Sequence, residues 1–357
     1  MLSSVNKPSY KFLVALLLLL FCVLFSSCST NITLPADGSA FTSCQDTTCT
    51  PSASTSSQGV GTGAQGVKVF VEPDAGSKVI TDAINQAQKS VWLEMYLLTN
   101  RNVITALEET AHRNIDVRVM LEAHPYGGGS VSPTETLDTL HAAGVKTKTT
   151  SPDFALTHEK GMIIDGTTAF ITTANFTLAA LGDSKSTKNR EYGIIDTDPQ
   201  DVQTVITIFN ADWNRSSLQQ IDAPNLVVSP IDSRKDFLTL IGSAKKSLSI
   251  EAEEMQDTQI EQALSDAANH GIQVQVILPK GSSSDSNGKG ITAIERSGVQ
   301  VKESSKLYMH AKIIIVDGQQ AFVGSENIST ASLNRNRELG IIVSDAAVLN
   351  TLQSTFQ

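Results

Sequence analysis

The sequence predicts an α/β fold made of two repeated α/β/α-sandwich halves that are related by a pseudo-two-fold axis. An internal repeat runs through most of the chain, with an offset of 157 residues at its start that shrinks only slightly along the unit. Within each copy, short runs of consecutive apolar residues alternate with helical stretches, as in βαβ units. Strands that are apolar on both faces are typical of sheets covered by helices on both sides.

The repeat is visible in five pairs of segments. They are 90–94 with 247–251, 115–121 with 272–278, 143–145 with 297–299, 158–165 with 310–317, and 189–191 with 336–338. A period near 150 residues is too long for a solenoid, so we expect two halves, 67–220 and 221–357, that pack once against each other. Equivalent motifs would then face one another, and each would supply half of one site.

The first 28 residues are typical of an export signal. Lys7 and Lys11 precede an unbroken apolar run over 12–25, which is shorter than a membrane span. The run ends in Phe-Ser-Ser-Cys and is similar to a bacterial lipoprotein signal, with Phe25 in place of the usual Leu. This predicts Cys28 as the lipidated first residue of a protein anchored to a membrane outside the cytoplasm; ordinary secretion after cleavage nearby is the alternative.

Residues 29–66 are rich in Ser, Thr, Gly, Gln and Ala and poor in bulky apolar side chains, which predicts a flexible tether. Cys44 and Cys49 lie within it and could form a small disulfide loop in an oxidising compartment. No cysteine follows residue 50, so a thiol nucleophile and a thiolate zinc site are excluded from the folded region.

Two short motifs carry the chemistry. His158 and Lys160, like His310 and Lys312, are two residues apart, which places both side chains on one face of a strand. An Asp-Gly turn follows each apolar run and leads into a second strand. Asn175 ends that second strand in the first half and Asn327 in the second, so each half presents His, Lys, a hydroxyl and an Asn at the edge of a hairpin.

This arrangement resembles the phospholipase D superfamily, whose motif is HxKx4Dx6GSxN. The second half matches every defined position: His310, Lys312, Asp317, Gly324, Ser325 and Asn327. The first half keeps His158, Lys160, Asp165 and Asn175 but has Thr172 and Thr173 in place of Gly-Ser, and the branched Thr172 would crowd the phosphate. The resemblance covers about 290 of the 357 residues.

The resemblance implies a covalent mechanism without a metal or other cofactor. One histidine forms a phosphohistidine, and the other protonates the leaving group and later activates water. By analogy we assign the nucleophile to His158 and the acid/base role to His310, although the near symmetry of the site leaves the order open. The lysines supply fixed positive charge, and hydrogen bonds to the phosphate oxygens are expected from Asn175, Asn327, Ser325 and Thr173.

Glu191 and Glu338 repeat in a shared Asn-Arg-Glu segment. Each could hold a catalytic histidine in one tautomer, as the third member of a triad does, and the family has such pairs. A surface salt bridge with the neighbouring Arg190 or Arg337 is the alternative. Asp165 and Asp317 are expected to be structural and to bond turn amides away from the phosphate.

Fold alone does not set the substrate. The leading expectation is hydrolysis of glycerophospholipids at a membrane surface to phosphatidic acid and the head-group alcohol. The net charge of −10 gives nucleic acid little to bind non-specifically, but an exported nuclease is the second candidate. A cardiolipin-synthase-type phosphatidyltransferase and an inactive binding module are further alternatives, and no obligate protein partner is evident.

Overall fold

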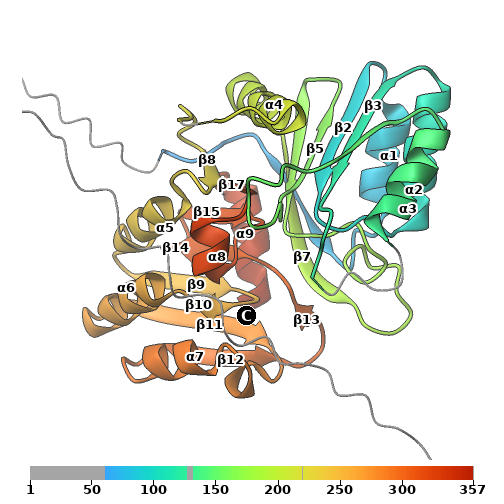
Figure 1. The fold of residues 1–357 in the computed structure, drawn as a ribbon. Helices are drawn as coiled ribbons and strands as arrows, with labels where there is room; N and C mark the ends of the chain where they lie inside the picture. Colours follow the sequence, from blue (N-terminus) through green and yellow to red (C-terminus); the bar gives the residue numbers. More distant parts are fainter. Residues whose placement is uncertain (1–60, 127–131, 219, 357) are drawn as a thin grey trace, which may run out of the picture. The chain divides into compact units, whose positions relative to one another are not determined.

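Two sheets with the same strand order form the body of the protein. A computed structural model describes residues 61–126, 132–218 and 220–356, all of which belong to the compact unit Ser56–Gln357. The first sheet runs β1-β7-β6-β5-β2-β3-β4 and the second runs β8-β17-β15-β14-β9-β11-β12. Read in this direction, each strand of one sheet corresponds to the repeat-related strand of the other, so the predicted pair of α/β halves is confirmed (Figure 1).

Within the described residues, the first half contains seven strands and four helices. The strands are β1 (Lys68–Glu72), β2 (Ser90–Met95), β3 (Asp116–Leu121), β4 (Lys146–Thr149), β5 (Lys160–Ile164), β6 (Thr168–Thr172) and β7 (Asn189–Asp196). The helices are α1 (Lys78–Gln86), α2 (Arg101–His112), α3 (Pro133–Ala142) and α4 (Pro199–Asn214).

The second half repeats this plan with small additions. Its main strands are β8 (Leu226–Ser229), β9 (Ser247–Glu251), β11 (Gln273–Pro279), β12 (Gln300–Ser304), β14 (Ile313–Val316), β15 (Gln320–Gly324) and β17 (Glu338–Val343). Three two-residue strands are added: β10 (Met255–Gln256), β13 (Tyr308–Met309) and β16 (Ile328–Ser329). The helices are α5 (Ser233–Gly242), α6 (Thr258–Asn269), α7 (Gly288–Glu295), α8 (Thr330–Asn334) and α9 (Ala346–Gln353), with short 3-10 turns at Ser282–Ser284 and Ser354–Phe356.

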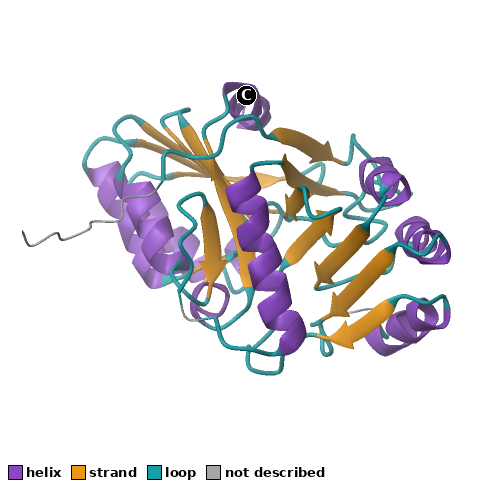
Figure 2. Ribbon diagram, turned by 90° about the horizontal axis from the view of Figure 1, so that it is seen from above, coloured by secondary structure: helices purple, strands orange, loops and turns teal. Residues whose placement is uncertain are grey.

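Helices cover the outer face of each sheet. Apolar residues of α1, α2 and α3 pack with the first sheet in one core, and those of α5, α6 and α7 pack with the second sheet in another. A third core lies between the sheets and contains residues of α4, α9 and strands of both halves. Helices flank the two groups of strands on their outer sides (Figure 2). The inner faces therefore pack partly on helices and partly on the opposite sheet, so they are not covered by helices alone.

Equivalent Asp-Gly turns hold the two motif hairpins in place. Asp165 and Gly166 join β5 to β6 with φ of 55° and 68°, and Asp317 and Gly318 join β14 to β15 with φ of 53° and 66°. Two positive φ values in succession are the geometry of a type I′ turn. The Asp165 carboxylate accepts backbone N–H bonds from residues 88–90, and the Asp317 carboxylate does so from residues 245–247. Both aspartates are structural, as predicted.

The halves meet through reciprocal backbone contacts next to the two His-x-Lys motifs. Thr157, just before the first motif, forms a bridge with Arg337 of the second half. Strand β13, just before the second motif, pairs in parallel with Asn189–Arg190 of β7. An exchange in which each half contacts the equivalent segment of the other is what a two-fold axis requires.

The predicted tether is too long at its C-terminal end. Ala64, within the predicted 29–66 segment, is buried and forms a bridge with Val343 at the end of β17. Its N–H donates to the carbonyl of Ile342 at 2.9 Å, and its carbonyl accepts from Ser344 at 2.9 Å. The ordered body thus includes 61–66.

The remaining N-terminal predictions lie outside the described residues. These are the signal at 1–28, lipidation of Cys28, the Cys44–Cys49 loop and the tether up to residue 60. Within 61–126, 132–218 and 220–356, the structure contains no helix of the length and hydrophobicity needed to cross a bilayer.

Candidate active site

The two motifs come together where the halves meet. His158 precedes β5 and His310 precedes β14, and the backbone of each is bonded to the opposite half: His158 N–H donates to Arg337 O at 2.8 Å, and His310 N–H donates to Arg190 O at 3.4 Å. Both histidines are buried and retain a small exposed fraction, 8% for His158 and 7% for His310. The predicted half-sites therefore lie at one junction.

Each histidine is paired with a glutamate from the opposite half. His158 Nδ1 lies 2.9 Å from Glu338 Oε2 in a hydrogen bond. His310 Nδ1 lies 2.8 Å from Glu191 Oε1, in an ion-pair contact that is not an aligned hydrogen bond. The sequence placed each glutamate about thirty residues after the histidine of its own half, but the structure crosses them. Neither motif has its orienting carboxylate without the other half.

The salt-bridge alternative for these glutamates is wrong. Glu191 and Glu338 are both 0% exposed. Arg337 instead pairs with Asp212, with Nη2 donating to Oδ1 at 3.0 Å, and Arg190 donates to the carbonyl of Glu72 at 3.1 Å. A buried acid needs a hydrogen-bonding or charged partner. Because neither arginine pairs with Glu191 or Glu338, the imidazoles are the charged partners of these two carboxylates, which can hold the rings in one orientation.

Burial and charge act on the first pair in opposite directions. Burial, helped by the charge of Lys160, lowers the pKa of His158 even though Glu338 pulls it upward. Burial alone would raise the pKa of Glu338, but His158 and Lys160 lower it below its ordinary value. The pair therefore favours a neutral His158 with a free electron pair on Nε2 while Glu338 stays ionised.

The two lysines are buried in different surroundings. Lys312 Nζ donates to Glu253 Oε2 at 2.8 Å and to His310 O at 2.5 Å. Lys160 Nζ donates to His158 O at 2.6 Å and lies 5.3 Å from the centre of the Tyr96 ring. Burial lowers the pKa of Lys160 from 10.5 to about 7, so an arriving anion would increase the charge on this lysine.

Asn175 and Asn327 lie beside the motifs with side chains that are nearly buried, at 8% and 7% exposure. The Oδ1 atom of each is buried without a hydrogen-bond partner. These amides remain candidates for contact with a substrate, and the predicted hydrogen bonds to phosphate oxygens stay a prediction.

Thr173 and Ser325 have a different role from the predicted phosphate contact. Both are 0% exposed. Thr173 Oγ1 donates to Glu191 Oε2 at 2.6 Å and accepts from Tyr192 N–H, and Ser325 Oγ accepts from Leu339 N–H. Thr173 is therefore engaged with Glu191 and Ser325 with the backbone of β17, which are contacts inside the fold and not contacts with a phosphate.

Thr172 does not crowd the site. It is 0% exposed, and its hydroxyl donates to Lys160 O at 3.2 Å. At the equivalent Gly324, a Cβ atom would lie 2.6 Å from Glu326 Oε2 and would collide with Gly340. The first half has Ala174 where the second has Glu326. A glycine is therefore required at 324, where the backbone of Gly340 and the side chain of Glu326 both approach closely.

Sequence reasoning missed two residues at the site. Tyr96 stacks edge-on against His158, with ring centres 4.7 Å apart. Glu253 Oε2 lies 3.4 Å from His310 Nε2. Each stands two residues after a repeated strand-end glutamate, Glu94 or Glu251, so the same position of the repeat carries a phenol in one half and a carboxylate in the other. The sequence signal that could have identified Tyr96 and Glu253 is their shared position in the repeat, just after β2 and just after β9.

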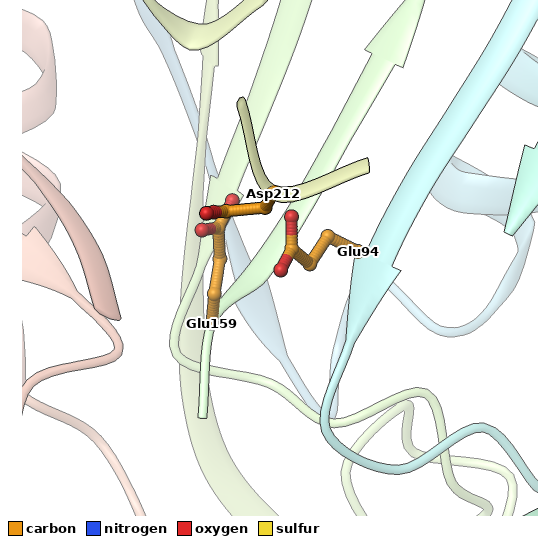
Figure 3. Close-up of side chains that lie close together, drawn as sticks. All are labelled: Glu94, Glu159 and Asp212. Atoms are coloured by element: carbon orange, nitrogen blue, oxygen red, sulfur yellow. The ribbon is translucent and has the colours of Figure 1, made fainter. Parts of the chain in front are cut away.

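A buried group of carboxylates lies behind the first motif. Glu94, Glu159 and Asp212 point toward one another (Figure 3), and within the described residues they form the one acidic group compact enough to hold a metal ion. Arg337 already neutralises Asp212. Burial raises the pKa of Glu159 to about 8 and that of Glu94 well above its ordinary value. Protonation of the two glutamates, together with the Arg337–Asp212 pair, therefore explains how these acids can lie so close together without a metal ion.

Two half-sites joined in this way, on two repeated α/β halves, define the phospholipase D superfamily, and the protein is an enzyme of that class. The family model described as "Cardiolipin synthase, PLD-like domain" matches residues 80–213 and 237–357. The chain belongs to this family.

Relatives of known name agree with this family. The chain is 24% identical over 334 residues to a probable cardiolipin synthase, YwiE, of Bacillus subtilis (strain 168), covering 82% of this chain and 65% of the relative. It is 25% identical over 321 residues to a cardiolipin synthase of Halalkalibacterium halodurans, covering 78% and 62%. The chain thus spans less than two thirds of the length of these two relatives.

Solved structures share the fold. Polyphosphate kinase from Porphyromonas gingivalis matches 81% of this chain and 46% of its own, with a TM-score of 0.64 and 14% identity. Phosphatidylserine synthase from Haemophilus influenzae Rd KW20 matches 81% of this chain and 84% of its own, with a TM-score of 0.62 and 13% identity. At these low identities, the similarity shows a shared fold.

Proposed function

We propose that the protein cleaves the head-group phosphodiester of glycerophospholipids through a phosphohistidine and passes the phosphatidyl group to an alcohol, with water as the competing acceptor. The observation that carries this proposal is the crossed pairing of His158 with Glu338 and of His310 with Glu191. Two oriented imidazoles at one junction can divide attack and proton transfer between them.

The reaction divides into two displacements. His158 Nε2 attacks phosphorus, the bond to the leaving oxygen breaks, and that oxygen takes a proton from His310 Nε2. An acceptor hydroxyl then returns a proton to His310 as its oxygen attacks phosphorus, and the bond between phosphorus and His158 breaks. Lys160 and Lys312 stabilise the charge on the phosphoryl oxygens in both transition states.

A phospholipid substrate is supported by the names of the relatives, which are cardiolipin synthases, and by the acidic composition of the chain. A membrane anchor at Cys28 would bring the enzyme to its lipid at high effective concentration. Hydrolysis to phosphatidic acid, the leading expectation from the sequence, becomes the outcome when no alcohol competes.

Incubation of the purified protein with labelled phosphatidylglycerol and phosphatidylethanolamine, with and without a short primary alcohol, tests the proposal. We expect a phosphatidyl-alcohol to form at the expense of phosphatidic acid. Turnover should continue in EDTA, because lysines and histidines supply the charge and proton transfer. Cleavage of single-stranded DNA with neither lipid product would instead assign the site to a nuclease.

A further inference from the structure

The two half-sites differ at one position that faces the reacting atoms. Tyr96 and Glu253 are repeat-related, and each lies next to the histidine of its own half. His310 has a carboxylate near both ring nitrogens: Glu191 at 2.8 Å from Nδ1 and Glu253 at 3.4 Å from Nε2. Among the described acids, none but Glu338 pairs with His158.

Because Glu253 lies beside His310 and Tyr96 lies beside His158, the two sides of the site differ in charge. Lys312 is paired with Glu253 at 2.8 Å, but in the described part of the chain Lys160 has no carboxylate within ion-pair distance. An incoming phosphate therefore meets, beside His158, a lysine without a carboxylate partner whose charge the phosphate would increase, and it meets a carboxylate beside His310. The phosphoryl group is drawn to the His158 side, and the alcohol oxygens are left on the side of His310 and Glu253.

Glu253 is placed to accept hydrogen bonds. Its side chain is 21% exposed, and Oε1 accepts from Tyr308 Oη at 3.3 Å. Burial would raise the pKa of Glu253, but the charges of His310 and Lys312 outweigh it and hold the pKa well below its ordinary range. The group is therefore a carboxylate at neutral pH, with acceptor capacity only.

We propose that Glu253 selects the acceptor: it binds one hydroxyl of a vicinal diol, such as a glycerol head group, while the adjacent hydroxyl delivers its proton to His310. This inference rests on the proposed phosphatidyl transfer and names the residue that decides which alcohol is used. Hydroxyl oxygens on adjacent carbons are ~3 Å apart, the separation of a hydrogen-bonded pair. That spacing matches the 3.4 Å between His310 Nε2 and Glu253 Oε2.

An ammonium head group fits this position less well than a neutral hydroxyl. The oxygen that would receive it, Glu253 Oε2, already lies 2.8 Å from the ammonium of Lys312. A second cation there would be repelled, whereas a hydroxyl can donate to the remaining electron pairs of the carboxylate. The charge pattern therefore favours a polyol over ethanolamine as the acceptor.

Competition between matched acceptors tests the proposal. Propane-1,2-diol and propan-1-ol each have one primary hydroxyl and compete in one tube for the same phosphohistidine, so their product ratio is independent of how much enzyme is active. We expect the wild-type protein to favour the diol by about tenfold, as for a hydrogen bond to a charged group. Glu253→Met, which has no strong acceptor, should bring the ratio close to one, and Glu253→Gln should lie between.

Glu254→Gln is the matched control, because Glu254 is the adjacent acid and, among the described residues, is not paired with either catalytic histidine. It should keep the wild-type ratio. A wild-type ratio near one, an unchanged ratio in Glu253→Met, or a preference for 2-aminoethanol over both alcohols would overturn the role of Glu253 and leave phosphatidyl transfer standing. If no phosphatidyl-alcohol forms from any acceptor, the proposed function fails and this inference fails with it.

Discussion

The two halves share a strand order and a His-Lys motif, but they differ at three positions in or next to that motif and its hairpin. In the first half, Tyr96 lies beside His158, Glu159 stands between His158 and Lys160 in the sequence, and the buried Thr172 ends β6. The second half has Glu253, Ala311 and Gly324 at these positions. Symmetry thus builds the junction, and the departures from symmetry give its two histidines different surroundings.

The largest effect should come from removing either histidine, and the two losses should differ in kind. His158→Ala and His310→Ala should each lower kcat on a phospholipid by on the order of 10⁴-fold or more, since the groups act as a unit. A p-nitrophenyl phosphodiester has a leaving group that needs no proton. His310→Ala should therefore release one equivalent of nitrophenolate in a burst and stop with a phosphoryl group on His158.

His158→Ala should give no burst. Rapid-mixing absorbance measures the burst, and mass spectrometry under non-acidic conditions locates the adduct. A burst found in His158→Ala and absent from His310→Ala would exchange the two roles. Near-wild-type turnover in either variant would show that the two motifs do not form a single site.

The crossed glutamates should give the next largest effect. Glu338→Gln should lower kcat by on the order of 10³-fold, because the amide no longer fixes the tautomer of His158. The nitrogen NMR shifts of the His158 ring should change while those of His310 stay in place, and Glu191→Gln should give the converse. A change in the ring of the same half instead would contradict the crossed pairing.

The unequal motifs predict a difference in stability. Gly324→Thr should cost roughly 3 kcal/mol or more, because its side chain would collide with Gly340 and Glu326. The reverse change in the first half, Thr172→Gly, should cost only about 1–2 kcal/mol through one lost hydrogen bond and added chain entropy. Urea unfolding measures both.

Replacing Glu326 tests the cause of that difference. In Gly324→Thr, a second change of Glu326→Ala copies the first half, where Ala174 stands, and should recover part of the lost stability. An equal cost for Gly324→Thr and Thr172→Gly would mean that the packing around Glu326 does not explain the glycine.

The smallest effect concerns Glu159, which the second half replaces with Ala311. Burial raises the pKa of Glu159 from 4.5 to about 8, so the folded protein holds this proton over a range where the unfolded chain has lost it. Its ionisation therefore costs stability progressively as pH rises from 4.5 to 8. Glu159→Gln should raise the melting temperature by roughly 2–4 °C at pH 8 and hardly at all near pH 5. A pH-independent difference would trace the effect to packing.

Much of the fold and the meeting of the two motifs could be predicted from the sequence because the repeat is long and regular. Strand spacing placed His158 with Lys160 and His310 with Lys312, and the Asp-Gly turns predicted both hairpins. The sequence could not tell that Glu338 serves His158, because such a pairing depends on how the two halves dock. Nor could it assign Tyr96 and Glu253, whose positions past a strand end gain meaning only beside the imidazoles.

The hydroxyls of Thr173 and Ser325 show a second limit. A motif records which residue types recur, but it does not state which side of the strand faces the substrate. Both side chains are fully buried and engaged with Glu191 or the backbone. Thr173 supports the carboxylate of Glu191 and Ser325 supports a strand, and the sequence pattern alone cannot separate such support from contact with phosphate.

The crossed pairing also bears on how such a protein can evolve. A single half would hold a histidine without its orienting acid, so it could act only as a dimer of identical copies. In such a dimer every substitution enters both half-sites together, and neither imidazole can acquire surroundings of its own. Joining two copies in one chain removes that constraint. Tyr96 and Glu253 are then independent positions, and attack and proton transfer can be refined separately by single mutations.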